Sequence, residues 1–466
     1  MLWIKQSPRA QSRASPKAGA SAIQSCKRRL LVKRTVKSKF VRPPAFVYQC
    51  GVGGGGQPVL FCESVSLERL AASHRTPLYV YSTAMIRERI KAFARAFRLI
   101  PHTLCYSVKA NSSLAILRLI ARESAGFDVV SGGELERVLR VDRQAANRVV
   151  YSGVGKTVPE MELALRAGIL LFNIESASEL EALAETAARM KRQAAIAVRV
   201  NPDVSTKTHP YISTGLLEHK FGVPIPEAET LYSKAAKQPY LKVAGVSVHI
   251  GSQITDVSSF ADALERVADL VRALRTQGHD IRYVDAGGGL GISYEGAAEN
   301  FAQRISAYAR AVLKPLRRLK VHVLLEPGRS IVGPAGALLT RAIYRKTNDR
   351  KRFLIVDAAM NDLLRPSLYR AYHEIVPVTR SNEETEMTDV VGPICETGDF
   401  FARDRELPVV REGDLLAILD VGAYGAVLAS NYNTRGKAAE VLVDGAKASV
   451  IRGRESVQDQ MRLERL

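Results

Sequence analysis

The stretch Tyr106-Ser107-Val108-Lys109-Ala110-Asn111 decides how the rest of the chain is interpreted. A short apolar run, 104–108, leads into Lys109, and a helix-like segment follows directly. This pattern predicts a strand whose last residue opens into a loop. A lysine at the mouth of a rigid strand can be held near neutrality and can form a Schiff base with a carbonyl group. Since most lysines at strand ends are solvated, the interpretation depends on whether other segments reach the same place.

From Leu78 onward, apolar strand-like runs alternate with amphipathic helical segments. The eight runs are Leu104–Val108, Phe127–Val130, Val149–Tyr151, Leu170–Ile174, Ala195–Val200, Val243–Ile250, Tyr283–Asp285 and Val321–Leu325. Helices are expected between them, for example at Ser113–Glu123, Pro159–Ala167, Ala177–Met190, Ser259–Thr276 and Asn300–Leu319. Eight such units over about 250 residues favour a closed (β/α)8 barrel over a doubly wound open sheet. The sequence therefore predicts an α/β fold with a TIM barrel over 78–330.

The segments on either side of the barrel have a different pattern. Strand-like runs at Ile331–Lys346, Arg352–Val356, Leu415–Leu419 and Ala438–Val443 predict a β-rich C-terminal domain over 331–466. Long polar, loop-rich segments are expected between Asn361 and Asp414. The N-terminal segment 46–77 contains a strand-like run, Pro58–Cys62, and then a short helix capped by Ser66. This early strand is expected to join the β-rich domain.

The charge of the chain is concentrated at its beginning. The sequence has 67 basic and 47 acidic residues, a formal net charge of +20, and Met1–Cys50 holds twelve Lys or Arg and no Asp or Glu. Beyond Cys50 the balance is 55 minus 47, or +8, so the high pI does not indicate a nucleic-acid-binding protein. Residues 1–45 are expected to be a disordered basic extension: a plastid or other organelle transit peptide, a nucleic-acid-binding arm or, as the favoured interpretation, a stretch upstream of the true start.

Two further features indicate the compartment. The five cysteines show no repeated CxxC spacing, which argues against a disulfide framework and fits a reducing, cytoplasmic compartment. No apolar run is long enough to span a bilayer, so no membrane association is expected.

Polar and glycine-rich residues follow six of the predicted strands, at the end of a barrel where active sites lie. These residues are Lys109 with Asn111, Ser131–Glu134, Arg199 with Asn201, His249–Gln253, Asp285–Gly291 and Glu326–Arg329. Glycines Gly287, Gly288 and Gly289 either let backbone N–H groups approach a phosphate or form a tight turn. Their position after the seventh strand favours phosphate binding.

The remaining strand ends also allow two interpretations each. His249 can stack on a flat ring or act as an acid, or it is a core histidine. Glu326 can hold a proton on a heteroaromatic nitrogen, or it pairs with a barrel arginine such as Arg199. Arg329 can bind a carboxylate or phosphate through its fork, or it is a solvated loop residue.

One cofactor uses all of these groups together. Pyridoxal phosphate needs a Schiff-base lysine, a phosphate cradle, a partner for its ring face and an acid–base partner at its pyridine nitrogen. A carboxylate at that nitrogen keeps it protonated, so that the ring can accept carbanion electrons, which favours decarboxylation. No metal site is expected.

Four of these segments together resemble the fold-type III, alanine-racemase-like pyridoxal-phosphate decarboxylases: Tyr106–Asn111, His249–Gln253, Asp285–Gly291 and Glu326–Ser330. Further motifs resemble those of the diaminopimelate decarboxylases within that group. They are His209–Gly215, Lys220–Gly222, Arg365–Tyr369, Cys395–Asp399, Gly422–Gly425 and Ser430–Asn433. The likeness runs from about Phe46 to the C-terminal region, and the ordered set is more specific than any single motif.

The resemblance implies a role for each motif. Lys109 would carry the cofactor as a Schiff base, His249 would stack on its ring, and Glu326 would face its pyridine nitrogen. Cys395 would protonate the carbanion. The other cofactor contacts would come from Ser252, Gly287, Gly288, Gly289, Gly328, Arg329 and Tyr424. The distal end of the substrate would be held by Arg329, Arg365, Tyr369, Tyr424 and Glu396.

The implied reaction is decarboxylation of meso-2,6-diaminopimelate to L-lysine and CO2, the last step of lysine biosynthesis by the diaminopimelate route. The implied assembly is a homodimer in which the partner subunit supplies Cys395 and Glu396. Two arginines and one glutamate match a distal carboxylate and ammonium. One departure is Arg75, where the family usually has glycine; a local turn change is expected there.

Other functions remain open at this point. A relative acting on ornithine, arginine or carboxynorspermidine is the runner-up. An alanine racemase would place an arginine at the pyridine nitrogen, where this chain presents Glu326. A pyridoxal-phosphate homeostasis protein would lack the second domain, and a nucleic-acid-binding protein is the remaining different class.

Overall fold

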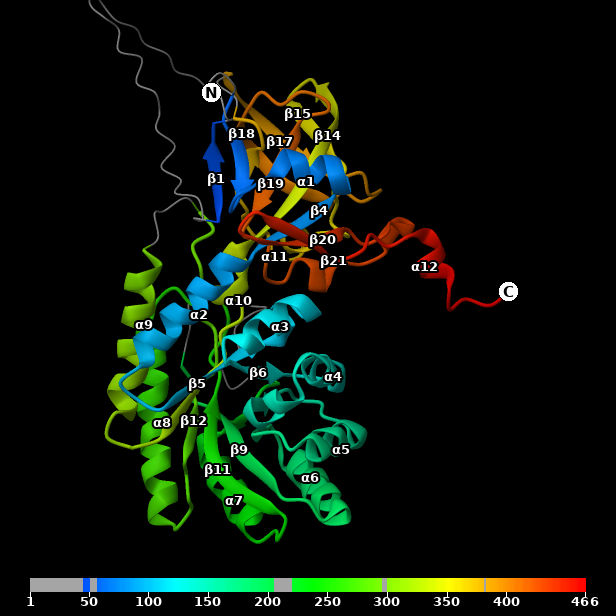
Figure 1. Cartoon of the computed structure of the whole chain (residues 1–466). Helices are drawn as coiled ribbons and strands as arrows, with labels where there is room; N and C mark the ends of the chain where they lie inside the picture. The colour runs from blue at the N-terminus through cyan, green and yellow to red at the C-terminus, as the bar shows by residue number, and fades with distance from the viewer. Residues whose placement is uncertain (1–44, 51–56, 205–219, 296–299, 381–382) are drawn as a thin grey trace, which may run out of the picture. The chain divides into compact units, whose positions relative to one another are not determined.

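The computed structural model describes residues 45–50, 57–204, 220–295, 300–380 and 383–466 (Figure 1). The expected basic extension, residues 1–45, lies outside the described residues except for Ala45, and the motif His209–Gly215 lies wholly outside them. All elements below belong to one unit of the chain, Lys39–Leu466.

Eight parallel strands close into a barrel, which confirms the predicted fold class. Their order is β5-β6-β7-β8-β9-β11-β12-β13, and β13 pairs with β5 to complete the ring. The strands are β5 (His102–Ser107), β6 (Gly126–Val129), β7 (Val149–Tyr151), β8 (Leu171–Ile174), β9 (Ala194–Asn201), β11 (Leu241–Val248), β12 (Tyr283–Asp285) and β13 (His322–Leu325). A short strand, β10 (Val223–Pro224), adds to β9. Each predicted run therefore contributes one strand.

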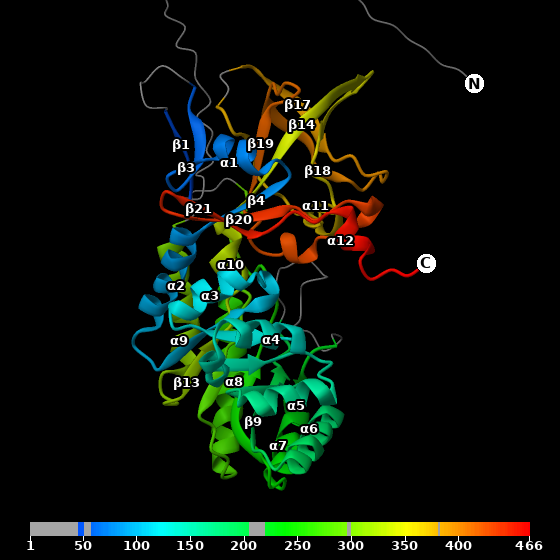
Figure 2. The same ribbon diagram turned by 45° about the vertical axis from the view of Figure 1, so that its right-hand side comes forward.

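Helices lie outside the barrel strands (Figures 1 and 2). They are α2 (Thr83–Phe97), α3 (Leu114–Arg122), α4 (Gly132–Val141), α5 (Val158–Ala167), α6 (Ala177–Met190), α7 (Ile225–Ala236), α8 (Ser258–Thr276) and α9 (Phe301–Leu316). Serines at the strand-to-helix turns fix where two of them begin. Ser131 accepts the backbone N–H of Glu134 at α4, and Ser176 accepts that of Glu179 at α6. None of the helices in the described ranges is long and apolar enough to cross a membrane.

The β-rich part is built around a long strand, β14 (Gly336–Asn348), in the sheet order β18-β17-β15-β14-β4-β20-β21. Its other strands are β4 (Leu78–Ser82), β15 (Lys351–Val356), β16 (Ile375–Pro377), β17 (Thr385–Val391), β18 (Phe400–Pro408), β19 (Leu415–Leu419), β20 (Ala439–Asp444) and β21 (Lys447–Arg452). Its short helices are α10 (Arg329–Val332), α11 (Arg365–Tyr369) and α12 (Val457–Met461). β19 pairs with β14 and β16.

The structure corrects the predicted start of the barrel at residue 78. β4, which the prediction assigned to the barrel, pairs with β14 and β20 in the β-rich sheet. All five of its residues are buried, as in a barrel strand, so its apolar pattern could not distinguish the two locations.

The β-rich region contains two further differences. The predicted strand Ile331–Lys346 begins only at Gly336, because α10 and a 3-10 turn, Gly333–Ala335, precede it. β17 and β18 form an antiparallel pair inside the region expected to be loop-rich. Polar residues are buried here while an apolar one is exposed, since Thr388 and Asp389 are each 6% exposed and Met387 is 53% exposed, so the composition does not reveal the strands.

The N-terminal strands form a small sheet of their own, β1 (Phe46–Gln49), β2 (Val59–Cys62) and β3 (Val65–Ser66). It is joined to the β-rich part through the hydrogen bond from Leu60 N to Val378 O, at 2.7 Å. Helix α1 (Leu67–His74) follows, with Ser66 as its cap. Arg75 ends it at a φ of +61°, a conformation that suits glycine, so the arginine keeps the turn at some cost in backbone strain.

Candidate active site

A cavity at the barrel mouth brings together most of the residues expected from the strand ends. It is lined by Ser107, Lys109, His249, Ser252, Gly289, Leu290, Glu326, Gly328, Arg329 and Tyr424. Tyr424 comes from the β-rich part, and its backbone N–H donates to Ala110 O at 2.8 Å. The cavity therefore lies where the carboxyl ends of the barrel strands meet the β-rich part.

Lys109 lies at the entrance to this cavity with one carboxylate beside it. Its Nζ donates to Asp128 Oδ2 at 2.6 Å, and its side chain is 34% exposed while that of Asp128 is fully buried. Burial acts to lower the pKa of Lys109, but the charges of Asp128 and Glu326 outweigh it and raise the pKa above its ordinary value. Asp128 thus holds the ammonium in a fixed position, from which it must lose a proton to act as a nucleophile.

Glu326 follows β13 and is almost completely buried. Its Oε1 accepts a hydrogen bond from Ser152 Oγ at 3.2 Å. Burial, followed by the nearby charges of Asp128 and Asp285, raises its pKa well above the ordinary value. The alternative partner considered for Glu326, Arg199, pairs instead with Glu175 at 3.0 Å. The carboxyl of Glu326 is therefore left facing the cavity.

His249 is a neutral imidazole at one side of the cavity. Burial, reinforced by the positive charges of Arg199 and Lys109, lowers its pKa well below the ordinary value. Its Nδ1 accepts the backbone N–H of Gly288 at 3.1 Å, so the ring proton lies on Nε2. Although Nδ1 lies 3.8 Å from Glu326 Oε2, a neutral ring makes no ion pair there. A neutral, oriented ring suits stacking.

The glycine loop after β12 has no room for side chains. A Cβ on Gly287 would lie 2.4 Å from Val248 O, and one on Gly288 would lie 2.1 Å from Glu326 O. Gly289, with a φ of +100°, also has a backbone conformation that favours glycine. The loop therefore packs directly on the neighbouring strand ends, and its backbone borders the cavity.

Two buried arginines, Arg329 and Arg365, lie near one another at the cavity, although of the two only Arg329 is among the residues that line it. Arg329 donates to Tyr294 Oη at 2.6 Å and to Ser252 Oγ at 3.2 Å, and Arg365 bonds to His373 Nε2 at 2.8 Å. Both guanidinium groups lie over the ring of Tyr294, at 5.9 and 4.7 Å from its centroid. Neither Nε has a hydrogen-bond partner among the residues that the structure describes, although both atoms are buried. Buried donors without partners are where an anionic group would bind.

Comparison with known proteins identifies this constellation. Residues 83–333 match the pyridoxal-binding domain of the pyridoxal-dependent decarboxylases. The diaminopimelate decarboxylase of Pseudomonas aeruginosa is 51% identical over 400 residues, which cover 86% of this chain and 95% of that protein. The chain belongs to the diaminopimelate decarboxylase family.

Solved structures of this family are also similar to the chain. The Helicobacter pylori diaminopimelate decarboxylase complexed with L-lysine matches with a TM-score of 0.81 at 43% identity, covering 85% of this chain and 98% of that one. The M. jannaschii diaminopimelate decarboxylase in co-complex with L-lysine matches with a TM-score of 0.84 at 36% identity, covering 91% and 98%.

The residues of the cavity fit pyridoxal phosphate, the cofactor of this family. An amine (Lys109) and a buried carboxyl (Glu326) lie in the same cavity as His249, with the side-chain-free loop and Arg329 at another side. The group requires a Schiff-base amine, a nitrogen partner and a phosphate cradle. All three chemical types are present in one cavity.

Six predicted site residues are not among those that line the cavity: Gly287, Gly288, Arg365, Tyr369, Cys395 and Glu396. Cys395 and Glu396 are exposed, on a loop fixed by Asp399, whose carboxylate accepts the backbone N–H groups of Met360 and Ile394. Tyr369 is half-buried at the end of α11. The structure therefore brings the cofactor residues together within one chain but leaves Cys395 and Glu396 at its surface.

Several buried polar residues around the site were not identified from the sequence. They are Asp128, Ser152, Asn173, Ser247 and His373, together with the half-buried Tyr294. Two of them, Asp128 and Asn173, lie inside predicted apolar runs. A charged or amide residue within such a run is the signal that could have revealed them, since barrel interiors are otherwise apolar.

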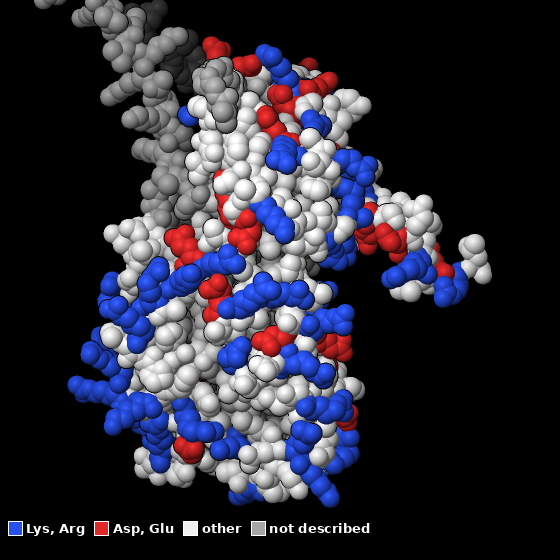
Figure 3. All heavy atoms as spheres, viewed as in Figure 1, with Lys and Arg blue, Asp and Glu red and all other residues white. Residues whose placement is uncertain are grey.

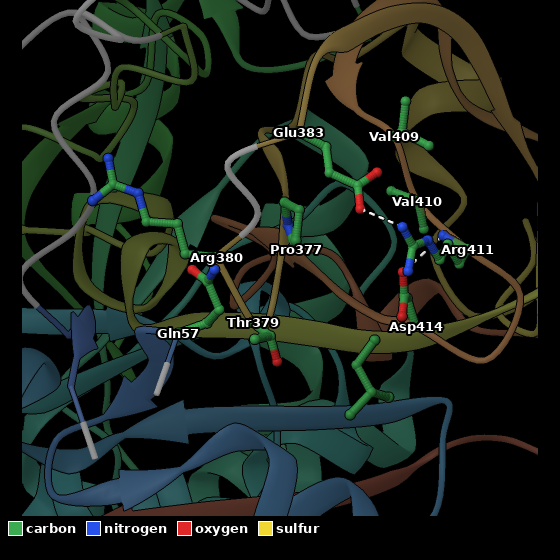
Figure 4. A pocket seen from close by; sticks show the side chains of 10 residues that line it. Gln57, Pro377, Thr379, Arg380, Glu383, Val409, Val410, Arg411 and Asp414 are labelled. Carbon is green, nitrogen blue, oxygen red and sulfur yellow. Dashed lines mark hydrogen bonds and ion pairs between the residues drawn. The ribbon is translucent and has the colours of Figure 1, made fainter. Parts of the chain in front are cut away.

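A larger hollow, of about 430 Å³, lies in the β-rich part (Figure 4). Arg411, one of its lining residues, pairs with Glu383 at 2.7 Å, and its backbone N–H donates to Asp414 at 2.7 Å. None of the predicted site residues lines it. On the face drawn in Figure 3, Lys and Arg are spread over the barrel helices, with Asp and Glu among them. The cavity containing Lys109 is thus the candidate active site.

Proposed function

We propose that this chain catalyses the pyridoxal-phosphate-dependent decarboxylation of meso-2,6-diaminopimelate to L-lysine and CO2, the last step of lysine biosynthesis by the diaminopimelate route. The observation that carries the proposal is the cavity that holds Lys109, Glu326 and Arg329, with Arg365 buried near Arg329 and with no partner among the described residues for the Nε of either arginine. The family membership supports the same activity. A homeostasis protein would need neither Arg329 nor Arg365 in these positions.

The chain's own residues divide the chemistry. Bound pyridoxal phosphate supplies an electron-withdrawing ring that stabilises charge on the substrate Cα as CO2 leaves. Lys109 provides the amine that attaches the cofactor, and Asp128 orients this amine at 2.6 Å. Glu326 presents its carboxyl to the pyridine nitrogen, and His249 covers the ring face. The glycine loop and Ser252 hold the phosphate through N–H and hydroxyl donors.

Substrate selection is assigned to the opposite side of the cavity. Arg329 and Arg365 carry unpaired Nε donors that match a distal carboxylate. Tyr424 lies with its ring 4.8 Å from the Arg329 guanidinium and restrains it. Tyr369 adds a hydroxyl, and Glu396 is the match for the distal ammonium. A diamine-forming enzyme would have no distal carboxylate for these arginines.

The site is completed by a second copy of the chain. Cys395, the proposed acid that protonates the carbanion, and Glu396 are exposed and do not line the cavity of their own chain. Their loop is nevertheless rigidly held, since Cys395 N–H donates to Asn433 Oδ1 at 3.1 Å. A homodimer that places this loop over the partner's cavity would explain why the loop is exposed and also held in one conformation. We further propose a cytoplasmic location, without a nucleic-acid or membrane partner, based on the scattered cysteines.

The test is CO2 release by the purified chain from meso-diaminopimelate, with and without added pyridoxal phosphate. Ornithine, arginine and carboxynorspermidine serve as competing substrates. The expected result is cofactor-dependent release from meso-diaminopimelate alone. Faster release from ornithine would show that the distal-carboxylate assignment of Arg365 is wrong. Racemisation without CO2 release would support the alanine-racemase alternative.

A further inference from the structure

Beneath the cavity, five barrel strands contribute side chains to one buried polar cluster. Asp285 ends β12 and Glu326 follows β13, while Ser152, Asn173 and Ser247 come from or directly after β7, β8 and β11. All five are at most 5% exposed. Glu326 lines the cavity but Asp285 does not, so any effect of Asp285 on a bound molecule acts through Glu326.

Hydrogen bonds distinguish the two carboxyls of this cluster. Asp285 accepts three donors: Gly287 N at 3.0 Å, Asn173 Nδ2 at 2.7 Å and Ser247 Oγ at 2.9 Å. Among the described residues, the Glu326 carboxyl accepts one hydrogen bond, from Ser152 Oγ at 3.2 Å. Donors stabilise the ionised form of a carboxyl. Asp285 is therefore the carboxylate of the pair.

The two carboxyls lie close enough to affect each other's pKa, and a pair of neighbouring buried carboxyls is most stable when it carries one proton. Since Asp285 keeps the charge, this proton lies on Glu326. The direction of the Glu326 pKa agrees, because burial and the charges of Asp128 and Asp285 raise it, while Lys109 acts to lower it. His249, the other titratable group facing Glu326, is neutral.

Asn173 links the two halves of the cluster. Its Nδ2 donates both to Asp285 Oδ2 and to Ser152 Oγ, the latter at 3.0 Å. Ser152 therefore uses its own hydroxyl proton to donate to Glu326. The Glu326 carboxyl is thus held from two sides in one orientation, and both of its supports depend on Asn173.

We propose that Asp285 is a positioning residue that acts through Glu326. Together with Asn173 and Ser152 it fixes the orientation of the Glu326 carboxyl, so that the pyridine nitrogen of bound cofactor meets a partner in a fixed position and stays protonated. The inference rests on the proposed function for the identity of the bound ring. A purely structural role for Asp285, as a brace for the glycine loop, would predict a loss of stability without any change at the nitrogen.

The test uses the full chain loaded with pyridoxal phosphate labelled with 15N at the ring nitrogen, whose NMR shift reports protonation directly. Asp285→Asn keeps the shape but replaces one acceptor oxygen with an NH2 group, so that the hydrogen bonds that orient the Glu326 carboxyl are rearranged. We expect its 15N signal to move toward that of the neutral ring, with kcat for CO2 release falling about 10- to 100-fold and KM little changed. The matched control is Asp362→Asn, which removes a carboxylate that is equally buried in the β-rich part; its 15N signal should equal that of the unmodified chain.

An unchanged 15N signal in cofactor-loaded Asp285→Asn would overturn the proposal. Should this variant not fold, Asn173→Ala tests the same point, because it removes the side chain that links Asp285 to Ser152 and so orients Glu326, and it should move the signal in the same direction. An unshifted signal in Asn173→Ala would equally overturn it. The two failures are distinguishable: an unmodified chain that releases no CO2 from meso-diaminopimelate contradicts the proposed function, while the 15N comparison still decides the role of Asp285.

Discussion

Two lysines follow strands at the same end of the barrel, and each pairs with a carboxylate at the same distance. Only one of them is accessible enough to react. Lys109 Nζ lies 2.6 Å from Asp128, and Lys156 Nζ lies 2.6 Å from Glu179. Lys156 is 1% exposed and also donates to Gly153 O at 2.8 Å and to Asn173 O at 2.7 Å. Its Nζ thus has three acceptors, so its side chain is held in place and turned away from substrate. Lys109 is 34% exposed and borders the cavity. Access and the number of acceptors, and not the ion pair, distinguish a reactive lysine from a structural one.

The largest expected effect comes from removing the side chain of Lys109, the reactive lysine of the two. Lys109→Ala should lose the absorbance band of a lysine-bound pyridoxal group and lower CO2 release by at least about 10³-fold, because the attaching amine is gone. Absorbance spectra of the loaded protein and CO2 assays measure both. A variant with an unchanged spectrum would show that Lys109 is not the attaching lysine.

Changing Lys156 should instead lower stability and leave the cofactor attached. Lys156→Met leaves the carboxylate of Glu179 buried without its cation, and breaking such a pair costs about 3–5 kcal/mol of unfolding free energy. The absorbance band should remain. Urea unfolding gives the stability change, with Lys91→Met, an exposed lysine of α2, as a control that should change little. Loss of the absorbance band in folded Lys156→Met would remove the distinction between the two lysines.

A third test asks whether Cys395 of a second subunit acts in the site that contains Lys109. Cys395→Ala should keep the cofactor and the stability but slow turnover by about 10²-fold, as expected for a lost general acid. Mixing it with Lys109→Ala should restore activity, since each mixed dimer would contain one intact site. Cys50→Ala changes another exposed cysteine and should leave turnover unchanged. Mixed dimers that form but stay inactive would contradict a shared site.

The barrel and the cavity lining were accessible from the sequence for a physical reason. Strand ends that face a cavity carry glycine and polar residues in a row, as Gly287–Gly289 and Glu326–Arg329 do, and such rows interrupt the apolar rhythm. The eight barrel strands were found because each is a short buried run. β4 was misplaced because a buried strand has the same pattern in either sheet, and only its pairing with β14 and β20 distinguishes them.

The buried polar residues that support the site could not be predicted from the sequence in the same way. Asp128 and Asn173 are single residues within apolar runs, and their roles depend on which other strand ends lie beside them. Lys156, like Lys109, follows a barrel strand, so neither composition nor position separated the two. Their difference arises from acceptors contributed by other segments, such as Asn173 O for Lys156.

The smallest expected effect concerns Glu134, a carboxyl near Lys109. Burial, with a contribution from the charge of Asp128, raises its pKa from 4.5 to about 7, although Lys109 and the hydrogen bond from Val130 N act to lower it. The folded state therefore binds this proton more tightly than the unfolded state. Stability should fall as the pH rises through the window between these two values.

Glu134→Gln removes this titration while its amide oxygen can still accept the N–H of Val130, so the decline across the window should flatten. Urea midpoints measured between pH about 4.5 and about 8 test this, with Glu136→Gln, an exposed carboxyl of α4, expected to follow the unmodified chain. An unchanged slope in Glu134→Gln would exclude Glu134 as its source. The same measurement sharpens the lysine comparison, because removing the charge of Lys109 should raise the pKa of Glu134 further and extend the decline to higher pH, whereas Lys156→Met should leave it as it is.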